Sequence, residues 1–137
     1  MKKSNPINII QIDHLVIRVN DLENMITFYQ DVLGCKLERG PGENRLAQLR
    51  IGHSLIDLVD TNGPLGQEGG DQPNHAAPNM DHVCFHVQPW DTNTIKKHLK
   101  QHGVNSGDIA TRYGASGMGP SLYLSDPEGN KIELKGS

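Results

Sequence analysis

Two aspartate–histidine pairs open similar apolar segments in the two halves of the chain. Residues 12–19 (IDHLVIRV) and 80–87 (MDHVCFHV) match at the aspartate, the histidine and the final valine. Because successive side chains of a strand alternate between its faces, His14 and His82 point away from the apolar side chains that would pack under a helix. Imidazole nitrogens bind divalent transition metals, so the two histidines are candidate metal ligands.

Two carboxylates recur in the same way further along each half. Asp57 lies in the run 54–59 (SLIDLV), and Glu133 lies in the run 131–135 (KIELK). In each run the neighbouring Ile and Leu face the helix, so the carboxylate shares the helix-free face with the histidine. Two nitrogen and two oxygen donors suit Zn, Ni, Co, Mn or Fe and are too rich in nitrogen for Ca or Mg. The sequence therefore predicts a divalent metal site.

A lone histidine in a strand is more often exposed, or buried with a hydrogen-bond partner, than bound to a metal. The recurrence of both residue types in register favours the metal site, because a solvated face has no reason to repeat them. Asp13 and Asp81 fall on the opposite face by the same alternation. We expect these two aspartates to make turn or helix-end contacts rather than to bind the metal.

Two side chains are expected beside the predicted carboxylate ligands. Pairing the strands about their turns places Gln48 near Asp57 and Tyr123 near Glu133. Tyr123 is then either a hydrogen-bond donor to a ligand or substrate, or an ordinary half-buried strand tyrosine. We take both residues as candidates for substrate binding.

Three more residues are candidate substrate-binding groups. Arg18 and His86 lie further along the cleft side, where they either contact an anionic substrate and orient a ligand or end in solvent. Arg112 begins the glycine-rich segment 112–120, which is either a loop over the cleft or a plain surface turn. As a loop residue, Arg112 would meet a carboxylate or a phosphonate.

Each half is predicted to have the element order β-α-β-β-β. In the first half, Asn20 is the expected N-cap and Glu23 the capping-box residue of a helix that ends at Gly34. In the second half, Asp91 or Thr92 caps a helix that stops at Gly103. The expected strands are 12–19, 45–51, 54–59, 80–87, 121–125 and 131–135, with one more in 34–39 and one in 104–112.

The chain of 137 residues has room for one hydrophobic core. We expect a single α+β domain over 1–137, with a first βαβββ module at 9–60, a linker at 61–79 and a second βαβββ module at 80–136. The linker is long enough to be mobile. The two modules would form a half-open barrel around a metal cleft, which is shared with the sister half or with a second chain.

Composition excludes several classes of partner. The net charge is −3 and no basic run is longer than a pair of lysines, so we expect no binding to nucleic acid. No apolar stretch approaches the roughly 20 residues of a membrane-spanning helix. Residues 1–8 have no apolar run typical of a signal peptide, so we expect a cytoplasmic protein. The two cysteines, Cys35 and Cys84, are expected to be free thiols.

From about residue 9 to residue 136 the chain resembles the vicinal oxygen chelate superfamily, also called the glyoxalase, bleomycin resistance and dioxygenase superfamily. Three motifs carry the resemblance: 12–22 (IDHLVIRVNDL), 28–34 (FYQDVLG) and 123–134 (YLSDPEGNKIEL). The resemblance implies paired βαβββ modules, a homodimer, and a metal held by first-strand histidines and fourth-strand carboxylates. By position these ligands are His14, Asp57, His82 and Glu133.

The resemblance also implies a reaction type. Members of the superfamily chelate adjacent substrate oxygens on a metal that acts as a Lewis acid. In a glyoxalase I-like lyase or isomerase, Glu133 would be the preferred base, since Asp57 is one methylene shorter than the usual Glu. A ring-cleaving dioxygenase would need only His14, His82 and Glu133. A fosfomycin-type thiol transferase is less favoured because Val16 occupies a place where that branch has Thr. A non-catalytic binder of the bleomycin-resistance type would characteristically lack the ligands.

Overall fold

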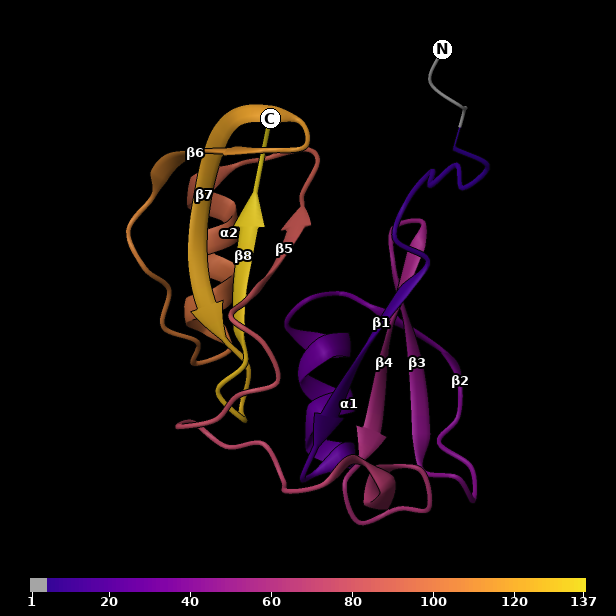
Figure 1. Cartoon of the computed structure of the whole chain (residues 1–137). Coiled ribbons are helices and arrows are strands. Elements are labelled where there is room, and N and C mark those ends of the chain that lie inside the picture. Colours follow the sequence, from indigo (N-terminus) through magenta and orange to yellow (C-terminus); the bar gives the residue numbers. More distant parts are fainter. Residues whose placement is uncertain (1–4) are drawn as a thin grey trace.

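The computed structural model describes residues 5–137 and contains two modules, each with one helix and a four-stranded mixed sheet (Figure 1). The sheets have strand orders β1-β4-β3-β2 and β5-β8-β7-β6, and in each the first strand runs parallel to the last. This arrangement confirms the α+β fold with two βαβββ modules. The first module contains β1 (His14–Val19), α1 (Leu22–Asp31), β2 (Lys36–Arg39), β3 (Leu46–Ile51) and β4 (Ser54–Asp60). The second contains β5 (Val83–His86), α2 (Thr92–Gln101), β6 (Ala110–Gly114), β7 (Gly117–Ser125) and β8 (Lys131–Lys135).

The first helix begins one residue later than the sequence predicts. Asp21, not Asn20, is the N-cap of α1, and its side chain accepts a hydrogen bond from the Asn24 amide. The Asn20 side chain is used elsewhere, because it donates to the Pro73 carbonyl and accepts from Thr61. Tertiary contacts outside the helix thus decided which of two adjacent capping residues is used.

The expected capping box is also absent, because Glu23 bonds to the Arg45 guanidinium, with its Oε1 2.7 Å from Nη2. In the second module the prediction is confirmed: Asp91 is the N-cap of α2 and accepts from the Thr94 amide.

The segment 112–120 is not a loop. It contains the end of β6 and the start of β7, which pair as an antiparallel hairpin with Tyr113 opposite Met118. The turn is tight because Gly117 adopts a φ of 87°, which glycine tolerates without strain. Arg112 therefore lies in a strand, where its side chain has a fixed place relative to the sheet.

The helix-covered faces of the two modules share one core. Buried apolar residues from both modules form a single cluster, and the buried Tyr29 hydroxyl donates to Asp126 Oδ2 at 2.9 Å across the module boundary. Asp126 also accepts from the amides of Glu128 and Asn130 and from the Asn130 side chain. The DPEGN turn between β7 and β8 is thereby locked to α1 as well as to itself.

The Glu128 carboxylate of this turn accepts hydrogen bonds from the amides of Asn20 and Asp21 at 2.7 and 2.8 Å. These amides stand at the start of α1, where unpaired donors and the helix dipole favour a negative charge. The second module therefore stabilises the helix of the first.

The segment between the modules includes a short 3-10 helix (Gly66–Gly69) and is held against β1. The Arg18 guanidinium donates to the carbonyls of Gly66, Gly70 and Asp71. The Asn79 side chain bonds both the amide and the carbonyl of Arg18, at 2.8 and 2.9 Å. These contacts tie both ends of the connecting segment to the first strand.

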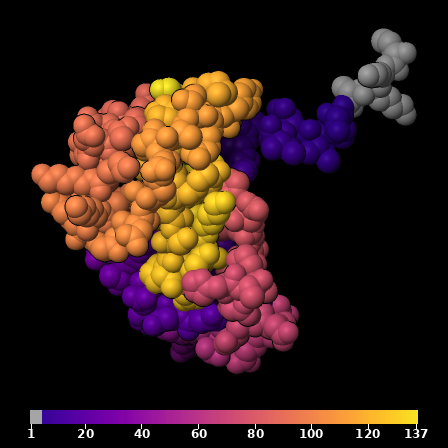
Figure 2. All heavy atoms as spheres, turned by 90° about the vertical axis from the view of Figure 1, so that its left-hand side faces the viewer, coloured from indigo at the N-terminus to yellow at the C-terminus, as the bar shows by residue number. Residues whose placement is uncertain are grey.

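Residues 5–10 are exposed and project from the body of the molecule, as the indigo segment in Figure 2 shows. Residues 11–13 are also exposed but are hydrogen-bonded to residues 53–55. In the part of the chain that the structure describes, no helix is long and apolar enough to span a bilayer.

Candidate metal centre

His14 and Asp57 lie together in the first sheet. The parallel register of β1 and β4 places Val16 opposite Asp57. His14 is two residues before Val16 on β1, so it lies on the same face of the sheet as Asp57. Asp57 is only 4% exposed, and the Gln48 side-chain amide donates a long hydrogen bond of 3.3–3.4 Å toward each of its carboxylate oxygens. The pKa of His14 is raised, first by its hydrogen bond with Asp13 and then by the negative charge of Asp57. The predicted pairing of Gln48 with Asp57 is what the register shows.

His82 and Glu133 form the equivalent pair in the second sheet. His82 Nε2 lies 3.3 Å from Glu133 Oε1, and Glu133 is 6% exposed. Tyr123 is directly opposite Glu133 in the register of β7 and β8, and its ring centroid is 5.5 Å from that of His82. The pKa of Tyr123 is raised by partial burial and by the charge of Glu133. A buried carboxylate with no arginine or lysine partner among the described residues suits metal ligation.

Asp13 and Asp81 hold the two histidines in the same way. Each accepts from the Nδ1 atom of the histidine that follows it, at 2.6 Å in both modules. The hydrogen bond from His82 lowers the pKa of Asp81. With the proton on Nδ1, the lone pair is left on Nε2, which is the arrangement of a metal-binding histidine supported by a carboxylate.

The expected turn or helix-end contacts of Asp13 and Asp81 are therefore not what the structure shows. Alternation does not apply to them, because β1 begins at His14 and β5 begins at Val83, so both aspartates precede their strands. The signal that could have revealed this role was the repeat of the Asp-His pair itself.

The two half-sites belong to separate sheets, and residues 5–137 contain no group of three or more His, Cys, Asp or Glu side chains placed to hold a metal ion. One chain therefore presents two half-sites, each with one imidazole and one buried carboxylate. One imidazole and one carboxylate are suitable ligands for Zn, Ni, Co, Mn or Fe. Two ligands from one half-site do not complete the coordination of such an ion.

The other candidate substrate-binding residues differ in their surroundings. Arg18 is engaged by three carbonyls of the connecting segment, so its guanidinium is largely used within the chain. His86 ends β5 and lines a pocket of about 640 Å³ together with Cys84 and His53. Arg112 donates to the Ser121 carbonyl and hydroxyl and lies over the Tyr123 ring.

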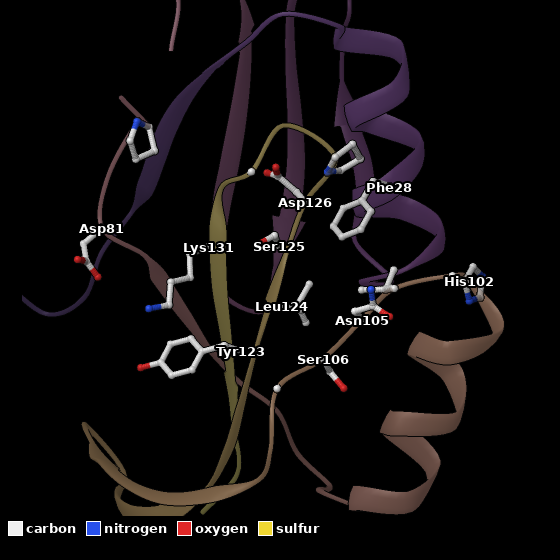
Figure 3. Close-up of a pocket in the computed structure, with 16 residues that line it drawn as sticks. Phe28, Asp81, His102, Asn105, Ser106, Tyr123, Leu124, Ser125, Asp126 and Lys131 are labelled. Atoms are coloured by element: carbon white, nitrogen blue, oxygen red, sulfur yellow. The ribbon is translucent and has the colours of Figure 1, made fainter. Parts of the chain in front are cut away.

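A larger pocket of about 940 Å³ borders the second half-site (Figure 3). Tyr123, Lys131 and Asp81 line one side of it, and Phe28 and Asn105 line another. Tyr123 pairs with Glu133 and Asp81 holds His82, but neither His82 nor Glu133 lines this pocket, so it contacts only residues beside the second half-site.

Paired βαβββ modules with a histidine and a carboxylate in equivalent strands define the class of protein. The model of the Glyoxalase/Bleomycin resistance protein/Dioxygenase superfamily matches residues 11–134, and the chain belongs to this superfamily.

Among curated proteins, the chain is 32% identical over 126 residues to virulence protein STM3117 of Salmonella typhimurium, covering 90% of this chain and 82% of that protein. It is 31% identical over 132 residues to metallothiol transferase FosB of Staphylococcus epidermidis, covering 92% and 81%. Among solved structures, the integron cassette protein VCH_CASS1 of V. cholerae matches with a TM-score of 0.75 and 28% identity, covering 95% of this chain and 97% of that one.

Proposed function

We propose that this protein is a divalent-metal-dependent enzyme that acts on a small oxygenated substrate, with each metal site shared between two copies of the chain. The observation that carries the proposal is the pair of matched half-sites, each with a buried carboxylate and a histidine whose Nδ1 is held by an aspartate. In a homodimer, His14 and Asp57 of one copy would face the partner's His82 and the partner's Glu133.

The surface around the half-sites supports association of two copies. Val16 lies on β1 opposite Asp57 and is 50% exposed, and Met118 of the β6–β7 hairpin is 59% exposed. Exposed apolar side chains beside a partly built polar site are typical of a surface that a partner covers.

The four side chains would have distinct roles in the assembled site. His14 and His82 would bind through Nε2, and the buried Asp57 and Glu133 would supply oxygen donors. When bound, the ion would act as a Lewis acid that stabilises an oxyanionic intermediate. Glu133 is the preferred base for moving a proton at the substrate carbon next to the chelated oxygen, because it is one methylene longer than Asp57 and lies opposite Tyr123.

We propose a lyase or isomerase reaction of the glyoxalase type as the first candidate. A thiol transfer is the second candidate, and the similarity to metallothiol transferase FosB favours it. In that reaction a thiolate would attack an epoxide carbon, forming a carbon–sulfur bond while the carbon–oxygen bond breaks. Val16 argues against it, because an apolar side chain there donates no hydrogen bond to a substrate oxygen.

Metal analysis tests the proposal directly. Protein purified without added metal or chelator is expected to be a dimer that carries two divalent ions, or about one ion per chain. The reason is that two copies with two half-sites each make two complete sites. His14→Ala and His82→Ala should each lose the ion. No stoichiometric metal in any preparation would refute the proposal and favour a ligand-sequestering binder.

The reaction type is tested with the metal-loaded protein. Turnover of a hemithioacetal with Ni or Zn would support the glyoxalase-type reaction. Consumption of fosfomycin with glutathione or cysteine would support thiol transfer, and activity only with Fe(II), a catechol and oxygen would support ring cleavage.

Replacing the aspartate behind a ligand is expected to weaken metal binding without removing a ligand. In Asp81→Asn the charged partner of His82 Nδ1 is lost, so we expect metal affinity to fall by about 10- to 100-fold. Competition against a chromophoric chelator measures the change. Asp31→Asn, which removes an exposed carboxylate at the end of α1, is the matched control. Equal affinities for the two variants would show that Asp81 does not support the ligand.

A further inference from the structure

The Asp–His pair that opens the second module is less firmly built into its sheet than the pair that opens the first. In the first module His14 pairs with Leu55 of β4, and the Leu55 amide donates to the Asp13 carbonyl at 3.0 Å. In the second module the ladder begins one position later, because β5 starts at Val83 and His82 precedes it. The pairing of β5 with β8 therefore does not hold the backbone of the second pair.

The segment 78–82 around this pair has little else to fix it. No backbone–backbone hydrogen bond joins residues 78–82 to any other residue that the structure describes. Met80 packs partly buried against the shared core, but apolar packing is not directional. A segment without directional anchors belongs to the least stable parts of a fold.

The contacts of His82 itself do not fix its position relative to the sheet. Nδ1 donates to Asp81 Oδ1 at 2.6 Å, and this bond joins two adjacent residues that move together. Nε2, which that bond leaves as an acceptor, lies 3.3 Å from Glu133 Oε1. Because two acceptors do not attract each other, a contact elsewhere must hold His82 close to the carboxylate.

Asn79 supplies this contact with its side-chain amide. Oδ1 accepts from the Arg18 amide at 2.8 Å, and Nδ2 donates to the Arg18 carbonyl at 2.9 Å. Nδ2 also donates to Asn130 Oδ1 at 3.0 Å. Asn130 is 2% exposed and directly precedes β8, the strand that carries Glu133. One side chain thus ties the segment before β5 to the start of β8 and to β1.

The bonds to Arg18 lie on the free edge of the first sheet. β1 is an edge strand, and the carbonyls of Asp13 and Val19 accept from amides on the β4 side. Backbone groups alternate in direction along a strand, so those of Arg18 point away from β4. The Asn79 amide therefore occupies the place that a neighbouring strand would take.

The hydrogen-bond partners require an amide at this position. The Arg18 amide is a donor, so Oδ1 of Asn79 must face it, and Nδ2 then faces two acceptor oxygens. An aspartate of nearly the same size would place an oxygen against both acceptors and lose two of the three bonds. Asn79→Asp therefore separates the role of the hydrogen bonds from the role of the space that the side chain fills.

We propose that Asn79 is a positioning residue that holds His82 in place beside Glu133. The inference rests on the proposed function, because it concerns the geometry of that same site. The Asn79 amide is engaged by its three hydrogen bonds, so it acts through His82 and is not itself a ligand. The first half-site needs no such residue, because the ladder of its sheet includes His14.

The first test measures the order of the backbone amides by NMR relaxation on the full-length protein without metal. In Asn79→Ala we expect the order parameters of Asp81 and His82 to fall from about 0.85, typical of rigid backbone, to below about 0.6. Asp13 and His14 should keep their values, which also shows that the variant is folded. Asn79→Asp should behave in the same way. Because it keeps one of the three hydrogen bonds, it serves if Asn79→Ala does not fold.

Asn74→Ala is the matched control. Asn74 lies in the same connecting segment, and its side chain accepts from the amides of Ala76 and Ala77 within its own turn. This variant should keep the order of Asp81 and His82.

The second test measures Co(II) binding by competition against a chromophoric chelator, together with the visible absorption of the bound ion. Both Asn79 variants are expected to bind Co(II) about tenfold more weakly and with an altered spectrum, because a displaced His82 changes the ligand geometry. Asn74→Ala should match the parent in affinity and spectrum. A residue that stabilised only the fold would lower the free energy of unfolding and leave the spectrum unchanged.

The outcomes separate this inference from the proposed function. Parent-like order of Asp81 and His82 in both Asn79 variants overturns it, and so does parent-like Co(II) affinity and spectrum in variants that have lost that order. Loss of order at these two residues, with Asp13 and His14 unchanged and Co(II) bound more weakly, supports it. If the parent binds no metal, the proposed function is refuted, and the relaxation data alone decide whether Asn79 holds the pair in place.

Discussion

Mixing the His14→Ala and His82→Ala variants is expected to restore metal binding that neither variant has alone. In a shared site, a dimer with one copy of each variant has one site in which both histidines are replaced and one in which both are present. Random exchange of subunits makes about half of the dimers mixed, so the mixture should bind about a quarter of the parent's metal. If each site lay within one chain, mixing would restore nothing.

The measurement is metal content after the two variants are unfolded together, refolded and dialysed against a trace of metal. Refolding each variant with itself is the control and should give no bound metal. Asp57→Ala mixed with Glu133→Ala extends the test to the carboxylates. Asp57→Ala by itself tests whether Asp57 is a ligand: if this variant keeps its metal while Glu133→Ala loses it, Asp57 is not a ligand and the His14, His82 and Glu133 set is sufficient.

Replacing Asp126 with Ala is expected to lower the free energy of unfolding by about 3 kcal/mol or more, the largest effect we expect on stability. Asp126 is 4% exposed and accepts hydrogen bonds from the Tyr29 hydroxyl, two backbone amides and the Asn130 side chain. Without its carboxylate these buried donors would be left unpaired. The β7–β8 turn would also lose its contact with α1, so both modules should be destabilised together.

Urea unfolding followed by circular dichroism measures this loss. Tyr29→Phe removes only the hydroxyl and leaves Asp126 with its other donors, so we expect a smaller loss of about 1–2 kcal/mol. Asp108→Ala, an exposed residue, should change stability by no more than about 0.5 kcal/mol. If Asp126→Ala were as stable as Asp108→Ala, the turn would not link the modules.

The pairs of side chains within each module follow from the sequence, because they depend on local rules. A strand alternates its faces, and a hairpin fixes the register of the strands it joins. These rules placed Gln48 beside Asp57 and Tyr123 beside Glu133, as the registers of the two sheets show. The repeat of histidine and carboxylate in both halves then indicated a duplicated fold.

Predictions about where helices and strands begin and end failed where a side chain at the boundary binds a residue that is distant in the sequence. Asn20 is a good N-cap by type, but its side chain binds Pro73 and Thr61, so Asp21 takes the position. Arg112 was expected in a loop or a surface turn and instead lies in a hairpin strand. Asp13 and Asp81 support the histidines because both strands begin after them.

The residue pattern predicts two equivalent βαβββ modules, each with one histidine and one carboxylate on its helix-free face. The packing of the modules through their helix-covered faces, with Tyr29 of one bound to Asp126 of the other, is visible only in the folded chain. That packing leaves the two half-sites on separate sheets. Alternation along a strand is a local property of the backbone, so it follows from neighbouring residues. The relative placement of two sheets depends on contacts between buried surfaces and polar groups that are far apart in the sequence.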